Sequence, residues 1–156
     1  MSKEIERKFL VKPAYFHLFQ EGELYRQGYI FSDKHKTVRA RIIKNKGFLT
    51  IKSKARGFTR DEFEYEIPFL DAEFILNNLC EKPLIEKYRS KVQVNIDIWE
   101  IDKFIGDNEG LFLAEIELNS EDQSFDKPEW VDKDVTGDIR YYNSSLVKNP
   151  FSNWKK

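Results

Sequence analysis

Apolar and charged residues alternate along eight segments of the chain. Side chains of an extended strand point alternately to opposite faces, so alternation with a period of two predicts half-buried β-strands. The predicted strands span residues 3–11, 24–31, 36–44, 47–55, 59–67, 85–92, 97–105 and 111–118. Several are joined by short turn-forming sequences, such as 32–35, 45–47 and 106–110, which favour hairpins. We therefore expect a mostly antiparallel sheet.

Helical features interrupt the strands in three places. Pro13 suits the first turn of a helix, Phe74, Ile75 and Leu79 form an apolar stripe, and Pro150 ends the last segment. The predicted helices span residues 13–20, 71–79 and 139–148. Flexible linkers, low-complexity tracts and repeats are not found in the sequence. We expect one domain of the α+β class over residues 1–156.

The overall charge is balanced and gives little attraction to polyanionic partners. The 26 basic and 27 acidic residues leave a formal net charge of −1, which argues against nucleic acid and anionic membranes as partners. Cys80 is the only cysteine, which excludes an intrachain disulfide and a thiolate zinc site. The start lacks the apolar core of a signal peptide, and no stretch is long enough to span a bilayer. These features predict a cytoplasmic protein.

Charged residues on one face of the predicted strands are sorted by sign. Basic residues dominate the third, fourth and sixth strands, at Arg39, Arg41, Lys52, Lys87 and Arg89. Acidic residues dominate the seventh and eighth strands, at Glu100, Asp102, Glu115 and Glu117. A wet sheet face is normal for antiparallel strands, but such a face tends to mix its charges. Eight antiparallel strands can instead close into a barrel whose charged faces turn inward, which would form a charged tunnel.

A charged tunnel needs a ligand, because unpaired buried charges are costly. Converging arginine and lysine side chains fit a polyanion, with arginine supplying bidentate hydrogen bonds and lysine a compact charge. Carboxylates cannot hold a phosphate directly, but they bind Mg²⁺ or Mn²⁺, which are often shared with substrate phosphates. Bases and acids in one cavity therefore predict a metal-bound polyphosphate.

These residues resemble the CYTH superfamily, the triphosphate tunnel metalloenzymes. The family's hallmark Glu-x-Glu-x-Lys is present as Glu4, Glu6 and Lys8. Further matches lie at residues 27–29, 38–41, 49–52, 60–64, 86–89, 99–102, 114–118 and 135–141, so the resemblance covers nearly the whole chain. Two positions depart from the pattern, Asp132 and Asp134, where similar chains usually have Gly and Glu.

The resemblance implies a closed eight-stranded antiparallel β-barrel, the triphosphate tunnel, with helices packed outside and one CYTH domain over residues 1–156. Members of the family hydrolyse inorganic triphosphate or thiamine triphosphate, or cyclise ATP to cyclic AMP, with a divalent metal. The expected partner is a small-molecule polyphosphate, and the sequence does not distinguish a monomer from a homodimer.

The resemblance also implies roles for individual residues, position by position. The implied substrate-binding residues are Arg39, Arg41, Lys52, Arg60, Lys87 and Arg89. The implied ligands of Mg²⁺ or Mn²⁺ are Glu4, Glu6, Glu115 and Glu117. Supporting roles, orienting the bases or holding a second ion, fall to Glu62, Glu64 and Asp102. Lys8 and Tyr29 resemble the family's catalytic pair; the base is Lys8, Tyr29 or metal-bound hydroxide, and a role of Lys8 as base requires a lowered pKa.

Three functions follow from these expectations. The first is metal-dependent hydrolysis of a linear triphosphate, with inorganic triphosphate favoured, by in-line attack of water. The second is an adenylate cyclase that makes cyclic AMP from ATP. The third is a polyphosphate-binding or nucleotide-binding module without turnover, which the full acidic set disfavours, since binding an anion gains nothing from carboxylates in the same cavity.

Overall fold

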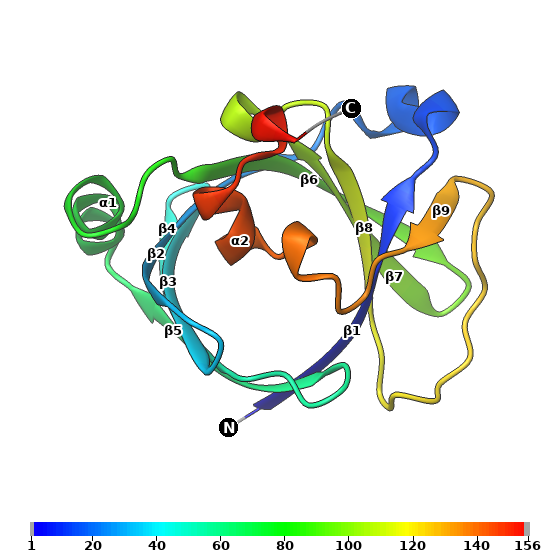
Figure 1. Ribbon diagram of the computed structural model, residues 1–156, viewed down its shortest axis with the longest axis horizontal. Coiled ribbons are helices and arrows are strands. Elements are labelled where there is room, and N and C mark those ends of the chain that lie inside the picture. Colours follow the sequence, from blue (N-terminus) through cyan, green and yellow to red (C-terminus); the bar gives the residue numbers. More distant parts are fainter. Residues whose placement is uncertain (1, 155–156) are drawn as a thin grey trace.

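The computed structural model describes residues 2–154, so residues 1, 155 and 156 of the predicted domain lie outside the described residues. Figure 1 shows a barrel seen end-on, with α2 lying across one end of it. The strands are β1 (Ser2–Val11), β2 (Glu23–Ser32), β3 (Lys36–Ile43), β4 (Lys46–Ser53), β5 (Thr59–Ile67), β6 (Ile85–Val94), β7 (Asp97–Phe104), β8 (Phe112–Glu117) and β9 (Val131–Asp134). The helices are α1 (Phe69–Asn78) and α2 (Asn143–Lys148), and the 3-10 turns are η1 (Pro13–Phe19), η2 (Gly106–Asn108), η3 (Ile139–Tyr141) and η4 (Phe151–Asn153).

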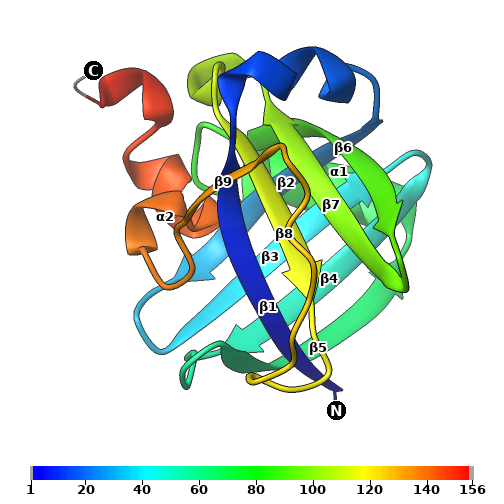
Figure 2. The ribbon, with the colours of Figure 1, turned by 90° about the vertical axis from the view of Figure 1, so that its right-hand side faces the viewer.

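Eight strands close into the barrel. Their order is β5-β4-β3-β2-β6-β7-β8-β1, and a further pairing of β1 with β5 completes the ring. Every pairing is antiparallel. Figure 2 shows β1 running along the barrel wall, with β9 beside its C-terminal half. The predicted closed eight-stranded antiparallel barrel is confirmed, and each predicted strand agrees with an observed one to within two residues at either end.

The structure differs from the sequence prediction in its ninth strand and in its helices. β9 pairs with β1 through Phe9 and Asp134 and through Val11 and Val131. The predicted first helix is the 3-10 turn η1, and the predicted third helix is broken at Tyr142, whose extended backbone separates η3 from α2. No helix within residues 2–154 is long and apolar enough to cross a membrane.

The apolar side chains form three clusters around the barrel. The largest lies outside β1, β7 and β8, where Phe9, Trp99 and Trp130 pack together under η1 and the segment that leads to β9. A second fills one end of the barrel interior, where Ile85 and Phe104 pack with Leu146 of α2. The C-terminal segment, residues 139–154, therefore closes part of that end of the barrel. The rest of the barrel interior is polar.

Helix α1 covers the outside of β3 and β4 through small side chains. The predicted apolar stripe is wrong at Phe74 and Leu79, which are more than half exposed, and right at Ile75, which packs against this core. The fully buried residues of α1 are Ala72 and Leu76. Ala72 lies directly over Gly47 of β4, and a Cβ added at Gly47 would stand only 2.5 Å from the Cβ of Ala72. The absence of a side chain at Gly47 thus lets the helix approach the barrel wall.

Replacing Gly47 with alanine is expected to destabilise the protein by about 1–3 kcal/mol, because the added methyl group overpacks this contact. Urea unfolding measures the loss. Introducing Ala72→Gly into the Gly47→Ala protein should recover part of the stability by removing the clashing methyl group, even though glycine itself weakens a helix by about 0.5–1 kcal/mol. Equal stability of the wild type and the single variant would contradict this account of the α1 contact.

Candidate active site in the barrel interior

The polar interior of the barrel encloses a cavity of about 280 Å³. All eight strands of the barrel contribute side chains to its wall, and the segment 142–144 contributes from the C-terminal end. The cavity walls contain fourteen of the fifteen residues that the sequence predicts as site residues: Glu4, Glu6, Lys8, Tyr29, Arg39, Arg41, Lys52, Arg60, Glu62, Glu64, Lys87, Arg89, Glu115 and Glu117. Only Asp102 lies behind the wall, where it is 1% exposed.

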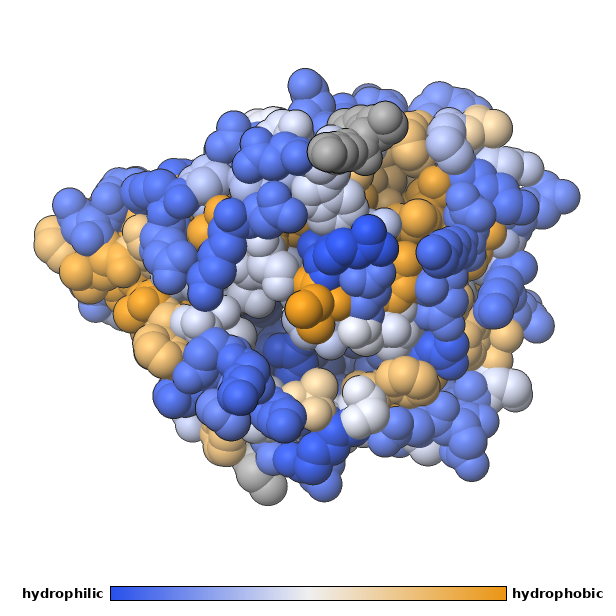
Figure 3. Space-filling model, viewed as in Figure 1, coloured by the Kyte–Doolittle hydropathy of each residue, from blue (hydrophilic) through white to orange (hydrophobic). Residues whose placement is uncertain are grey.

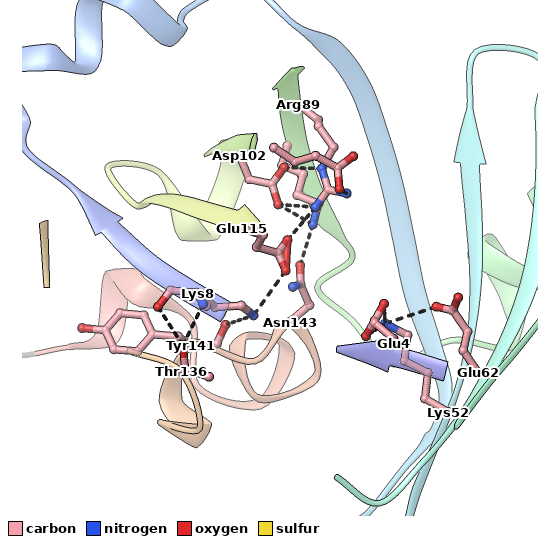
Figure 4. A network of polar contacts seen from close by, with 12 residues as sticks. Glu4, Lys8, Lys52, Glu62, Arg89, Asp102, Glu115, Thr136, Tyr141 and Asn143 are labelled. Atoms are coloured by element: carbon pink, nitrogen blue, oxygen red, sulfur yellow. Dashed lines mark hydrogen bonds and ion pairs between the residues drawn. The ribbon is translucent and has the colours of Figure 1, made fainter. Parts of the chain in front are cut away.

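Arg89 of β6 is held by Asp102 of the neighbouring strand β7 and by Glu115 of β8 (Figure 4), and Lys87 of β6 also pairs with Asp102. Arg89 donates two hydrogen bonds to Asp102, over 2.7 and 2.8 Å, and one to Glu115 over 2.7 Å. The Nζ atom of Lys87 lies 2.8 Å from Oδ2 of Asp102 and donates to Oδ1 of Asn143 over 3.1 Å. Because β6 pairs with β7, Asp102 stands directly opposite Arg89 in the ladder. Asp102 thus orients two cavity-lining cations from behind the wall.

A second group of charges lies on β1, β3, β4 and β5. Lys52 donates to both carboxylate oxygens of Glu4, over 2.9 and 3.0 Å, and its Nζ lies 3.6 Å from Glu62 (Figure 4). Arg41 donates to Glu64 over 3.1 Å, and the hydroxyl of Thr50 donates to the same oxygen over 2.8 Å. Both groups follow from the antiparallel ladder, which sets basic strand faces beside acidic ones.

Three carboxyl groups crowd together on β1 and β8. Burial, together with the charges of Glu115 and Glu4, raises the pKa of Glu6 well above its ordinary value. Burial alone would also raise the pKa of Glu115, but Lys8 and Arg89 hold it well below the usual range. Lys8 and Lys52 lower the pKa of Glu6 but do not offset these effects, so Glu6 holds a proton more tightly than an ordinary carboxyl group. A bound divalent cation would supply the missing positive charge and favour the carboxylate.

The donor set fits a divalent cation that is shared with a ligand. Within residues 2–154, no group of three His, Cys, Asp or Glu side chains is close enough to hold a metal by itself. Two of the predicted ligands, Glu4 and Glu115, are already paired with Lys52 and Arg89. Carboxylate oxygens suit hard cations such as Mg²⁺, which usually keep other ligands from substrate phosphates and water. Glu4, Glu6 and Glu115 would hold such a cation together with substrate oxygens.

Lys8 is buried as a cation. Its Nζ lies 3.9 Å from Oε2 of Glu115 and donates to the carbonyl oxygen of Tyr141 over 3.4 Å. Burial would lower the pKa of Lys8, but Glu115 and Glu6 outweigh it and raise the pKa above its ordinary value. The lowered pKa expected for a basic Lys8 is therefore not found, because the neighbouring carboxylates outnumber the cations that face it. Tyr29 stands opposite Arg39 in the β2–β3 ladder and lines the same cavity.

Sequence reasoning missed six residues of the cavity wall: Tyr25, Thr37, Lys91, Tyr142, Asn143 and Ser144. Tyr25 packs against two arginines, with the guanidinium carbons of Arg41 and Arg89 at 5.3 and 5.1 Å from its ring centroid. Tyr25, Thr37 and Lys91 lie an even number of residues from predicted site residues on the same strands, so strand alternation could have placed them inside the barrel. The other three arrive from a segment beyond the barrel, for which alternation gives no signal.

The lowered pKa of Lys87 predicts that activity depends on pH. Burial lowers the pKa of Lys87 to about 8, and Asp102 offsets only part of this effect. The ammonium is protonated below that pH and neutral above it, so the attraction for a polyanion should fall as pH rises through about 8. Because kcat/KM reports the free enzyme, the pH profile of kcat/KM for a polyanionic substrate of this cavity should decline there. The Lys87→Arg variant should keep its kcat/KM constant to higher pH, since guanidinium stays charged. If wild type and variant lost activity over the same alkaline pH range, Lys87 would not be the cause of the decline.

Comparison with known proteins gives a consistent result. A family model, the CYTH domain, matches residues 2–148. An inorganic triphosphatase of Acetivibrio thermocellus is 54% identical over 156 residues, which cover 100% of both chains. An inorganic triphosphatase of Nitrosomonas europaea is 36% identical over 152 residues, which cover 92% of this chain and 96% of that protein. The crystal structure of an inorganic triphosphatase has a TM-score of 0.65 and 33% identity, covering 94% of this chain and 95% of that one. The chain therefore belongs to the CYTH family, the triphosphate tunnel metalloenzymes, whose chemistry implies a divalent metal.

Proposed function

We propose that this protein hydrolyses inorganic triphosphate in its barrel cavity with the help of a divalent metal, Mg²⁺ or Mn²⁺. The observation that carries the proposal is the cavity itself, where cations and carboxylates from all eight strands converge on about 280 Å³. Its polar walls suit a small, highly charged ligand. The two relatives that match nearly the full length of the chain are both inorganic triphosphatases, which supports the same substrate.

The cations form the cradle for the phosphate chain. The cradle consists of Arg39, Arg41, Lys52, Arg60, Lys87 and Arg89. Arginine supplies directed hydrogen bonds to phosphate oxygens, and lysine supplies charge. Asp102 keeps Arg89 and Lys87 pointed into the cavity, so that the triphosphate meets donors already in place. Such preorganised charge supplies most of the acceleration of phosphoryl transfer.

The carboxylates and Lys8 act at the reacting phosphoryl group. Glu4, Glu6 and Glu115, with Glu117 two residues further along β8, would hold the metal together with substrate oxygens. A bound metal would neutralise charge on the phosphate oxygens and polarise the bond to be broken. Glu62 and Glu64 hold Lys52 and Arg41 in position. Lys8 adds a buried positive charge beside Glu115, and Tyr29 completes the wall next to Arg39. Water attacks the terminal phosphorus, the phosphoanhydride bond breaks, and phosphate and pyrophosphate leave.

A substrate panel tests this proposal. Phosphate release is measured with triphosphate, thiamine triphosphate, ATP and pyrophosphate, each with Mg²⁺, Mn²⁺ or Ca²⁺. The proposal expects triphosphate to give the highest kcat/KM, with Mg²⁺ or Mn²⁺ as activator. Cyclic AMP from ATP would indicate an adenylate cyclase, and tight triphosphate binding without hydrolysis would indicate a binding module. Localisation in the cytoplasm stays a prediction.

A further inference from the structure

A gap in the strand pairing of β1 opens the barrel wall at residues 6–8. On the side of β1 that faces away from β8, Ser2–Ile5 pair with β5, and pairing resumes only at Phe9, with β9. Within residues 2–154, no strand pairs with residues 6–8 on that side. The wall is completed there by two loops, residues 54–58 between β4 and β5 and residues 135–137 after β9.

The two loops supply the hydrogen bonds that a strand would otherwise make. The amide of Glu6 donates to the carbonyl oxygen of Phe58 over 3.4 Å. The amide of Lys8 donates to the hydroxyl oxygen of Thr136 over 2.8 Å (Figure 4), and the carbonyl oxygen of Lys8 accepts from the amide of Val135 over 2.9 Å. Because these partners come from two separate loops rather than from one strand, the wall is not continuous between them.

The space between the two loops is a cavity of about 40 Å³, which we call the notch. Half of its ten wall residues also line the tunnel cavity, namely Glu4, Glu6, Lys8, Arg60 and Tyr142. The other half come from the loops, namely Ala55, Gly57, Phe58, Thr136 and Gly137. A water molecule needs about 10–15 Å³ of such space, so the notch holds about three. It therefore leads water-sized molecules to the carboxylates and to Lys8.

A larger cavity, of about 460 Å³, also adjoins the tunnel, on the barrel face that is hollowed near its centre in Figure 3. It shares Thr37, Arg60, Tyr142 and Ser144 with the tunnel wall, and none of these is a carboxylate. Tyr142 borders all three cavities, with its ring centroid 5.6 Å from Nζ of Lys8 and 5.2 Å from the guanidinium carbon of Arg60. Of the two adjoining cavities, only the notch reaches the proposed metal ligands.

The proposed reaction needs such an approach for its nucleophile. In phosphoryl transfer the attacking oxygen stands in line with the leaving oxygen, on the opposite side of the phosphorus. A triphosphate held by the cradle of arginines and lysines fills the tunnel, so the attacking water must reach the terminal phosphoryl group by a separate route. The notch opens beside Glu6 and Lys8, where the proposed reaction places that group.

We propose that the attacking water reaches the terminal phosphorus from the notch, and that Phe58 sets the size of the nucleophile that can enter. This inference rests on the proposed function and adds to it a binding site for the second substrate, a small hydroxylic nucleophile. Phe58 is the largest of the loop side chains in the notch and is half-buried. Its ring packs on the outward-facing Arg7, with the guanidinium carbon 4.8 Å from the ring centroid, which holds the ring in place.

Methanol tests the size limit, since it differs from water by one methyl group. Protein is incubated with triphosphate, Mg²⁺ and a fixed concentration of methanol, and methyl phosphate, phosphate and pyrophosphate are quantified. When methanol replaces water, its oxygen bonds to the terminal phosphorus, the bridging P–O bond breaks, pyrophosphate leaves, and the methanol proton passes to solvent. The Phe58→Ala variant should raise the ratio of methyl phosphate to phosphate by about tenfold over wild type, the discrimination typical of one such group.

Two further substitutions at Phe58 extend the test. Phe58→Leu keeps more of the packing on Arg7 and should give a ratio between those of wild type and Phe58→Ala. Phe58→Trp narrows the notch and should lower kcat by about fivefold, with KM for triphosphate nearly unchanged, because triphosphate does not occupy the notch. Phe63→Ala and Phe63→Trp are the matched controls, since Phe63 is also half-buried but lines none of the three cavities. Both controls should match wild type in product ratio and kcat.

The product ratio separates this inference from the proposed function. Circular dichroism identifies the variants that fold. An unchanged ratio in folded Phe58→Ala or Phe58→Leu protein, or an equal change in Phe63→Ala, would overturn the role of the notch while metal-dependent pyrophosphate release still supported the proposed function. Wild type that released no pyrophosphate from triphosphate would overturn the proposed function itself, and this inference with it.

Discussion

Lys8→Ala is expected to lower kcat/KM for triphosphate by about 100-fold or more without unfolding the protein. The reason is that the buried ammonium of Lys8 faces the carboxylates of the proposed metal site, where charge develops on the reacting phosphoryl group. Removing a single preorganised donor from such a site typically costs about 100- to 1,000-fold in kcat. Steady-state phosphate release measures the effect.

Lys3→Ala is the matched control for Lys8→Ala. Lys3 lies on the same strand, is exposed, and has the opposite parity, so it points away from the cavity. Its replacement should leave kcat/KM within about twofold of wild type, in keeping with the small effect of surface substitutions. Circular dichroism should show folded barrels for both variants. A Lys8→Ala protein with the activity of wild type would contradict the proposed role of Lys8.

Asp102→Ala is expected to destabilise the protein by about 3–5 kcal/mol, the usual effect of breaking a buried ion pair from one side. Asp102 is almost fully buried and neutralises both Arg89 and Lys87. Its removal leaves two buried cations with only Glu115 and Glu100 to oppose them. Urea unfolding with linear extrapolation measures the loss.

Glu100→Ala gives the matched comparison for Asp102→Ala. Glu100 lies on the same strand and also contacts Arg89, with Nη1 and Oε1 3.2 Å apart, but its side chain is 32% exposed. Partly exposed ion pairs contribute about 0–1 kcal/mol, so this variant should unfold close to wild type. Equal losses for the two variants would show that burial of Asp102 does not set its contribution. A loss under about 1 kcal/mol for Asp102→Ala would contradict the buried network.

The strands of the barrel could be predicted from sequence because their two faces differ in chemistry. Along β3, Arg39 and Arg41 alternate with Ala40 and Ile42, and the structure buries both faces, one against α1 and the other around the cavity. β9 could not be predicted. Only Val131 among its four residues is buried, so the strand depends on its pairing with β1, which is distant in sequence.

The residues of the site could be predicted wherever they lie on barrel strands, since parity along a strand decides which side chains face inward. Tyr142 and Asn143 lacked any such signal. They reach the cavity because the predicted helix breaks at Tyr142 and the chain folds over the barrel end, where Asn143 accepts a hydrogen bond from Lys87. Asp134 departs from the family pattern, and it lies outside the cavity, paired with Arg7 and with the amide of Thr136.

The most direct test of metal-dependent triphosphate hydrolysis is a single time course. Purified protein is incubated with inorganic triphosphate and Mg²⁺, a chelator is added in excess, and Mg²⁺ is then restored, while phosphate release is followed throughout. The proposed function predicts steady release that stops on chelation and resumes when the metal returns. Release that continues undiminished in the presence of chelator would contradict it.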